Sequence, residues 1–420
     1  MVRPQSRHGA ARVEELLDAF PVVVVTGARQ VGKSTLAQAV ASARGGRYLT
    51  LDDALVRVQA LEDPQGFVAA REGLTVIDEV QLAPELMRAV KWSVDRDRRP
   101  GRFLLTGSAN LLRMKSVGES LAGRSAWFEL GPMTLAEIAG RPRSAHVDRA
   151  FAAPSAEEWA AAFVGPASEA SLELLRAHAI VGTMPGTLGM KPAVRRAWYD
   201  GYRQTFLERD LRQLAAIANL PEFARLVTMA ALRTGALLNR SALAADTGLP
   251  VATLRRYLDI LAIGYQFLEL PPFHANHGKR LVKAPKLYAN DVGLAAHLDA
   301  IESFDDAMAG GRAGALLETW AVNELRAIDR LADRPATATF FRTSDGREVD
   351  LVLERGRAVV GIEVKAAASA SPADLRGLRE LREAVGARFR LGIVAHLGRE
   401  VSVIDDKLVA VPLSTLVGLP

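Results

Sequence analysis

Residues 27–35, near the beginning of the chain, have the residue types and spacing of a phosphate-binding loop. Their sequence, Gly-Ala-Arg-Gln-Val-Gly-Lys-Ser-Thr, satisfies the pattern G-x-x-x-x-G-K-[ST] at every fixed position. The glycines let the backbone curl with its N–H groups pointing inward, and the positive end of the following helix also attracts an anion. This predicts binding of a nucleoside triphosphate, namely ATP, with Lys33 on the β- and γ-phosphates and Ser34 on Mg²⁺. The loop residues are Gly27, Ala28, Arg29, Gln30, Val31, Gly32, Lys33, Ser34 and Thr35.

Two carboxylates, Asp78 and Glu79, directly follow the apolar residues 74–77. We expect Asp78 to hold Mg²⁺, directly or through a water molecule, and Glu79 to orient and deprotonate the water that attacks the γ-phosphate. The next apolar run, 103–106, also ends in polar residues. Thr106 or Ser108 is expected beside the γ-phosphate, with capping of a following helix as the alternative role.

These groups need a scaffold that brings distant segments to one edge. Short apolar runs alternate with helix-prone stretches, which predicts an α/β domain over residues 1–140 with a parallel sheet covered on both faces. Ligands bind at the carboxyl ends of the strands in such sheets. The expected strands are residues 22–26, 48–51, 74–77, 103–106 and 127–130.

The composition is that of a folded protein with several domains. The chain has 420 residues, 49% of them hydrophobic and 24% charged, and this length suggests two to four domains. It contains no cysteine, which excludes disulfides and thiolate metal sites. The net charge of +5 is compatible with a nucleic-acid partner but does not identify one. No secretory or membrane-spanning run is present, so we expect a cytoplasmic protein without a membrane partner.

The first 140 residues resemble the AAA+ branch of the P-loop ATPases. The resemblance lies in the order of the phosphate loop, the Asp78-Glu79 strand end, the polar end of the next strand and Arg124 before the last strand. It implies that Arg124 is an arginine finger that reaches a neighbouring subunit's nucleotide, and therefore a hexamer or other ring oligomer. An ion pair within the subunit is the alternative, and Arg113 is a second candidate for the finger.

Four segments are similar to a narrower, widespread prokaryotic group of AAA+ ATPases that carry a C-terminal domain of unassigned role. They are Gly-Ala-Arg-Gln-Val-Gly-Lys-Ser, Ile-Asp-Glu-Val-Gln, Leu-Thr-Gly-Ser and Leu-Ala-Gly-Arg. Gln81 belongs to the second of them, and its role is not evident from its neighbours.

The middle of the chain shows a change of composition. Residues 141–170 are rich in Ala, Arg, Ser and Pro with little periodicity, which predicts a linker or insertion. Residues 171–225 contain amphipathic helical stretches, and the AAA+ resemblance implies that they form a helical lid over the nucleotide. Arg203, Arg209 or Arg212 could reach the γ-phosphate there, or could belong to a solvated salt-bridge face.

Residues 226–300 have the pattern of a winged helix-turn-helix. A short capped helix at 241–247, Gly248 at the turn and a second helix at 251–262 with inward leucines form the first part. Two strands, 265–270 and 286–289, joined by a basic tip, form the wing. Packing or protein contacts are the alternative use of this domain. The residues expected to contact DNA are Thr253, Arg255, Arg256, Lys279, Arg280, Lys283 and Lys286.

Residues 301–420 carry a second group of charged side chains. Glu318 lies on a predicted helix and Asp350 on a strand, while Glu363 and Lys365 alternate on the next strand and so share one face. This order resembles the α/β PD-(D/E)XK nuclease fold. The resemblance implies Asp350 and Glu363 as Mg²⁺ ligands, Glu318 as an auxiliary ligand and Lys365 as the group that activates water. An inactive form that binds DNA or protein is the alternative.

Together these patterns predict an ATP-hydrolysing, Mg²⁺-dependent AAA+ protein that acts on DNA, with a nuclease-like C-terminal domain. Branched or junction DNA in repair or recombination is the candidate substrate. The first alternative is a regulatory ATP-dependent switch whose C-terminal domain binds a protein partner. A second alternative is a DNA-binding regulator that acts through the winged helix alone.

Overall fold

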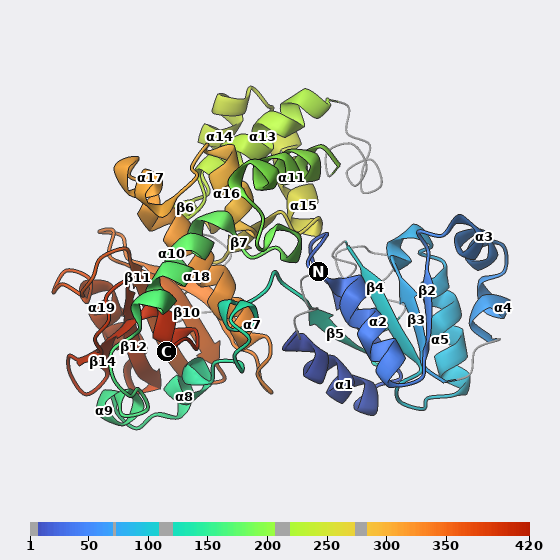
Figure 1. The fold of residues 1–420 in the computed structure, drawn as a ribbon, viewed down its shortest axis with the longest axis horizontal. Helices are drawn as coiled ribbons and strands as arrows, with labels where there is room; N and C mark the ends of the chain where they lie inside the picture. The colour runs from blue at the N-terminus through green and yellow to red at the C-terminus, as the bar shows by residue number, and fades with distance from the viewer. Residues whose placement is uncertain (1–6, 70–72, 109–120, 206–218, 274–283) are drawn as a thin grey trace. The chain divides into compact units, whose positions relative to one another are not determined.

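The computed structural model describes residues 7–69, 73–108, 121–205, 219–273 and 284–420 (Figure 1). The chain divides into two compact units. The first consists of residues 1–133 and 260–266, and the second of residues 134–259 and 267–420.

The first unit is built on a five-stranded parallel sheet, as predicted. Its strand order is β2-β3-β4-β1-β5, so β4 lies between the strand that precedes the phosphate loop and the strand that ends in Asp78. The side chains of residues 22–25 in β1 are fully buried, which is typical of a central strand covered on both faces. The strands are β1 (Val22–Thr26), β2 (Arg47–Thr50), β3 (Thr75–Asp78), β4 (Phe103–Gly107) and β5 (Ser125–Glu129).

Helices accompany this sheet, and one of them begins inside the phosphate loop. Gly32 is the N-cap of α2 (Lys33–Ala43) with a φ of 92°, a left-handed conformation that favours glycine. At Gly27, an added Cβ would lie 2.1 Å from the Leu130 carbonyl oxygen, so only glycine allows this close approach. The other helices of this unit are α1 (Gly9–Ala19), α3 (Ala54–Glu62), α4 (Pro64–Ala69), the 3-10 turn η1 (Val80–Leu82) and α5 (Leu86–Arg96).

The predicted pair of helices around Gly248 is present, and the division between the two units falls within the second of these helices, at residue 260. α14 (Arg240–Thr247) ends at Gly248, which has a φ of 72°, and α15 (Val251–Ile263) follows. The inward leucines of α15 are buried as expected, namely Leu254, Leu258 and Leu261. A small antiparallel sheet of order β6-β8-β7 accompanies these helices. Its strands are β6 (Ala236–Leu237), β7 (Phe267–Leu270) and β8 (Lys286–Ala289), and α13 (Leu220–Leu232) precedes them.

The expected linker at residues 141–170 instead forms two helices, α8 (His146–Ala152) and α9 (Ala156–Ala160). Trp159 is 2% exposed, and its Nε1 donates a hydrogen bond to the His146 carbonyl at 3.0 Å. The His146 ring stacks at a tilt on Phe163, with centroids 4.5 Å apart. The segment escaped prediction because each helix is too short to show a helical period, and a few aromatic side chains anchor both.

A six-stranded mixed sheet forms the C-terminal part of the second unit, in the order β13-β14-β12-β11-β10-β9. β9, β10 and β11 are antiparallel neighbours, whereas β11, β12 and β14 are parallel. The strands are β9 (Thr337–Arg342), β10 (Glu348–Arg355), β11 (Ala358–Lys365), β12 (Phe389–His396), β13 (Ser402–Val403) and β14 (Leu408–Pro412). The helices α8, α18 (Ala313–Asp329) and α19 (Arg376–Val385) pack on it, and α20 (Leu413–Leu416) ends the chain.

The remaining helices of the second unit pack on one another. α10 (Glu169–Val181) contacts α16 (Val292–Leu298), α17 (Phe304–Ala309) and α18, and α11 (Pro192–Thr205) contacts α16. α7 (Leu135–Ile138) begins with a capping box formed by Thr134 and Glu137.

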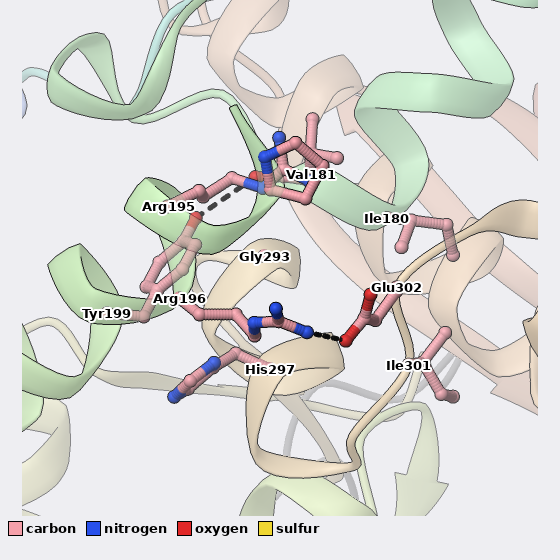
Figure 2. A pocket seen from close by; sticks show the side chains of 10 residues that line it. Ile180, Val181, Arg195, Arg196, Tyr199, Gly293, His297, Ile301 and Glu302 are labelled. Atoms are coloured by element: carbon pink, nitrogen blue, oxygen red, sulfur yellow. Dashed lines mark hydrogen bonds and ion pairs between the residues drawn. The ribbon is translucent and has the colours of Figure 1, made fainter. Parts of the chain in front are cut away.

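A small pocket lies between α10, α11 and α16 (Figure 2). The Tyr199 hydroxyl lies 3.1 Å from the Val181 carbonyl oxygen and 2.8 Å from Asp291 Oδ1. Burial raises the pKa of Asp291 to about 6, although its hydrogen bonds with Tyr199 and with backbone N–H groups act in the opposite direction. Arg196 forms an ion pair with Glu302 across the mouth of the pocket. This arrangement serves packing of the three helices.

We expect Gly293→Ala to destabilise the second unit. A Cβ at this position would lie 2.1 Å from Tyr199 Oη and 2.4 Å from the Val181 carbonyl oxygen. Such overpacking lowers the free energy of unfolding by about 1–3 kcal/mol, which urea denaturation measures. Gly314→Ala is the matched control, because a Cβ there meets nothing within 4 Å and lies in α18. The control should be more stable by about 0.5–1 kcal/mol, and equal effects of both changes would contradict the packing argument.

Candidate nucleotide-binding site

The phosphate loop connects β1 to α2 and closes around its own lysine. The Lys33 side chain is 4% exposed, and its Nζ donates hydrogen bonds to the carbonyl oxygens of Gly27 at 3.0 Å and Ala28 at 2.8 Å. A buried ammonium group inside a ring of backbone, at the N-terminus of an 11-residue helix, makes the loop suitable for an anion. The structure therefore brings Lys33 and the loop backbone together between β1 and α2, where the sequence placed them.

Asp78 ends β3 beside the loop and is nearly completely buried. Its carboxylate accepts hydrogen bonds from the Thr106 hydroxyl and, at 2.5 Å, from the Tyr48 hydroxyl. Burial and the bond to Asp78 raise the pKa of Tyr48, so this hydroxyl stays protonated and remains a donor. Tyr48 also interacts with the side chain of Ser34.

The oxygen atoms around Tyr48 fit a magnesium ion. Ser34 and Asp78 offer hydroxyl and carboxylate oxygens, the ligands that Mg²⁺ prefers, and Tyr48 brings the two side chains together. Sequence reasoning missed Tyr48, because a single tyrosine in a short strand has no distinguishing pattern.

Gln81 connects the two strand ends that carry the predicted catalytic residues. Its Nε2 donates hydrogen bonds to Glu79 Oε2 and, at 3.0 Å, to Ser108 Oγ. The backbone N–H of Glu79 lies 3.4 Å from Thr106 Oγ1. Glu79 has a φ of 57°, an uncommon conformation for a residue with a side chain, and its carboxylate is directed by Gln81. The sequence did not indicate a role for Gln81. In the structure its side-chain amide links the carboxylate of Glu79 to the hydroxyl group of Ser108.

Arg124 forms a two-pronged ion pair within its own domain. Its Nε lies 2.6 Å from Asp95 Oδ1, and its Nη2 lies 3.1 Å from Asp95 Oδ2. The hydrogen bonds from Arg124 hold the pKa of Asp95 below its ordinary value. The structure therefore shows the intrasubunit pair that was the alternative to an arginine finger. Arg113, the second candidate, lies outside the described residues.

The charged side chains predicted in the C-terminal domain are brought together on β10 and β11. Asp350 Oδ2 accepts a hydrogen bond from the Val364 N–H at 3.0 Å, and Glu363 Oε2 accepts one from the Asp350 N–H at 3.3 Å. Lys365 Nζ lies 2.6 Å from Glu363 Oε1. Burial and the neighbouring Asp350 carboxylate raise the pKa of Glu363 to about 8 and that of Glu318 to about 7.

Lys286 was expected to contact DNA, and the structure shows that this prediction is wrong. Its side chain is 4% exposed, and its Nζ lies 2.6 Å from Glu318 Oε1 and 3.1 Å from Asp350 Oδ1. It also forms an ion pair with Glu348. Lys286 is the first residue of β8 and points into the carboxylate cluster instead of toward solvent. The prediction failed because basic residues on a loop tip and on the buried strand that follows it cannot be told apart by composition.

Glu348 is a member of this cluster that sequence reasoning missed. It precedes Asp350 by two residues on β10, so the alternation of side chains along a strand could have indicated that both share a face. One oxygen atom from each of Glu318, Glu348 and Asp350 lies within 4.8 Å of the others. Such spacing would suit a divalent ion, but the ammonium group of Lys286 already contacts all three carboxylates. As arranged, the ammonium group occupies the carboxylates of Asp350 and Glu318, two of the three ligands that the nuclease resemblance implies for a magnesium ion.

The predicted DNA-contacting residues fall into two groups. Thr253 is half-buried and Arg255 and Arg256 are exposed on α15. Lys279, Arg280 and Lys283 lie outside the described residues. Of the arginines considered for the lid, Arg203 is half-buried on α11, whereas Arg209 and Arg212 also fall outside the described ranges. Within the parts of the chain that the structure describes, no helix has both the length and the apolarity to cross a bilayer.

Three family models match consecutive parts of the chain. An AAA domain matches residues 19–139. Two domains of unknown function, DUF8612 and DUF4143, match residues 172–305 and 313–416. Two curated relatives match over 412 residues with 32% identity, covering 97% of this chain and 83% of each relative. They are uncharacterised proteins, Mb2031c of Mycobacterium bovis and Rv2008c of Mycobacterium tuberculosis.

Solved structures of P-loop proteins are similar at low identity. The Walker-type ATPase PABY2304 of Pyrococcus abyssi aligns with a TM-score of 0.46 and 17% identity, over 71% of this chain and 99% of that chain. The RuvB Holliday junction branch migration motor of Thermotoga maritima aligns with a TM-score of 0.29 and 18% identity, over 64% and 93%. AMPPCP-bound DnaA from Aquifex aeolicus aligns with a TM-score of 0.26 and 15% identity, over 62% and 89%.

Proposed function

We propose that the protein hydrolyses ATP in a Mg²⁺-dependent reaction and uses this energy on DNA. The chain belongs to the same family as the two mycobacterial relatives, and an AAA domain matches its residues 19–139. The observation that carries the first half of the proposal is the network at the ends of β3 and β4. Glu79, Gln81 and Ser108 are hydrogen-bonded there, next to the phosphate loop on the neighbouring strand.

The residues of the phosphate loop and of the neighbouring strand ends have distinct roles in the proposed reaction. The loop N–H groups and Lys33 bind the β- and γ-phosphates, and Ser34 and Asp78 would hold Mg²⁺. The bound ion supplies positive charge that offsets the charge on the phosphate oxygens. Glu79 accepts the proton of the attacking water, and Gln81 keeps its carboxylate aimed at that water. Thr106 or Ser108 would sense the γ-phosphate through its hydroxyl group.

We extend the proposal to assembly in a ring, with Arg124 acting on the nucleotide of a neighbouring subunit. Its position before β5 and its similarity to the AAA+ pattern support this role. In the described chain Arg124 is bonded to Asp95, so the finger would act by exchanging this carboxylate for the γ-phosphate. Exchange of one anionic partner for another keeps the guanidinium group paired throughout.

The second half of the proposal, action on DNA, rests on α14 and α15. They form a helix–turn–helix arrangement around Gly248, and Arg255 and Arg256 are exposed in the first half of α15. Arginines at the beginning of such a helix contact phosphates and base edges in DNA-binding domains. For the C-terminal domain we propose DNA binding without cleavage, because Lys286 already pairs with Asp350 and Glu318, two of the carboxylates that cleavage would require.

Measurement of the ATPase rate with and without DNA tests this function. We expect duplex, single-stranded or junction DNA to raise the rate, and DNA affinity to fall steeply with salt. The double change Arg255→Ala and Arg256→Ala should remove the stimulation while the DNA-free rate stays unchanged. Arg88→Ala with Arg149→Ala is the charge-matched control at exposed positions of α5 and α8.

Two results would contradict the proposal in different ways. Equal ATPase rates with every form of DNA would remove DNA as the partner. Tight nucleotide binding with negligible turnover would instead support the alternative of a regulatory switch that binds a protein partner.

A further inference from the structure

A lysine side chain lies inside the carboxylate cluster of the C-terminal domain. Lys286 extends from β8, a strand of the three-stranded sheet, to carboxylates on α18 and β10. Lys286 and Asp350 are 64 residues apart in the sequence. A lysine is almost never fully buried unless its charge is matched, and here three carboxylates surround one ammonium group.

Each carboxylate of the cluster also accepts a hydrogen bond from a second donor. The Tyr288 hydroxyl donates to Glu318 Oε1 at 2.6 Å, and Arg342 donates to Glu348 Oε2 at 2.8 Å. Asp350 Oδ2 accepts the backbone N–H of Val364. Each carboxylate is therefore oriented by a donor of its own while it contacts the same ammonium group.

Burial alone would lower the pKa of Lys286. The attraction of Asp350, Glu318 and Glu348 outweighs burial, and the pKa of Lys286 is raised overall.

We propose that Lys286 is the resident cation of this cluster and takes the place that a divalent metal ion has in nuclease-like sites. The ammonium group satisfies the carboxylates without a metal, and it joins β8 to β10 and α18. This inference concerns the C-terminal domain and does not depend on ATP hydrolysis at the phosphate loop.

Binding of Mn²⁺ to the nucleotide-free full chain, measured by electron paramagnetic resonance, tests the proposal. Wild type and Asp350→Asn should bind the same amount of Mn²⁺, because Asp350 holds no ion when Lys286 is present. Lys286→Met should bind one more Mn²⁺ per chain than the wild type. That extra ion should disappear in the double variant Lys286→Met with Asp350→Asn. Lys407→Met is the matched control, since its Nζ donates only to the Pro154 carbonyl among the contacts that the structure gives, and it should leave Mn²⁺ binding unchanged.

Two outcomes would overturn the inference. The first is a Mn²⁺ ion that wild type binds and Asp350→Asn does not. The second is a folded Lys286→Met variant, verified by circular dichroism, that gains no ion. If Lys286→Met does not fold, the comparison of wild type with Asp350→Asn decides the question alone.

Discussion

Glu79→Gln lowers kcat for ATP hydrolysis by about 10²–10⁴-fold, the contribution of a general base, while ATP stays bound. Glutamine has the size of glutamate and can still meet Gln81 and the hydroxyl groups at the strand ends, but it cannot accept a proton from water. Steady-state turnover gives kcat, and titration with a fluorescent ATP analogue gives Kd. The expected pattern is a large fall in kcat with a Kd close to that of the wild type.

A matched change at Glu85 separates this effect from a general loss of charge. Glu85 is exposed at the N-terminus of α5, so Glu85→Gln should keep full activity. A Glu79→Gln variant with normal turnover would remove Glu79 from the role of base. Gln81 would then have no catalytic carboxylate to orient.

Lys33→Ala should abolish measurable nucleotide binding, with Kd raised by about 100-fold or more. Loss of a charge-assisted contact to phosphate in a buried site accounts for about 3 kcal/mol, and tenfold in Kd corresponds to about 1.4 kcal/mol. Titration with the fluorescent analogue measures this change. Lys91→Ala on α5 is the control with the same loss of charge in the same domain.

The Lys33 side chain also bonds the loop carbonyls of Gly27 and Ala28, so its removal affects the empty loop. Thermal unfolding followed by circular dichroism verifies that the variant is folded. Retained ATP binding in a folded Lys33→Ala variant would refute the assignment of the loop. DNA binding that survives this change while activity is lost would separate the α15 surface from the ATPase.

Features that depend on residues close together in the sequence could be predicted. The phosphate loop, the five parallel strands and the α14–Gly248–α15 turn all appear where local pattern indicated them. In each case the signal is a run of β-branched residues, a glycine with a left-handed backbone or a helical period. Such signals act over a few residues, which is the range that pattern reasoning covers.

Contacts between distant residues could not be predicted in the same way. Tyr48 and Asp78 are 30 residues apart, Gln81 and Ser108 are 27 apart, and Lys286 and Asp350 are 64 apart. Nothing in the types of these residues indicates a partner, because many surface residues have the same types. Only the strand order, which places β3 between β2 and β4, brings the first two pairs together.

The ion pairs of Lys286 have a consequence for how this protein can be divided. Family models match residues 172–305 and 313–416 as separate segments. However, the ammonium group of Lys286 in the first segment pairs with the carboxylates of Glu318 and Asp350 in the second. Phe273 likewise packs in the same apolar cluster as Val349 and Leu378. A fragment cut between the two segments would carry mutually repelling, half-buried charges and an uncovered apolar surface. We therefore expect the two segments to fold and unfold as one cooperative unit.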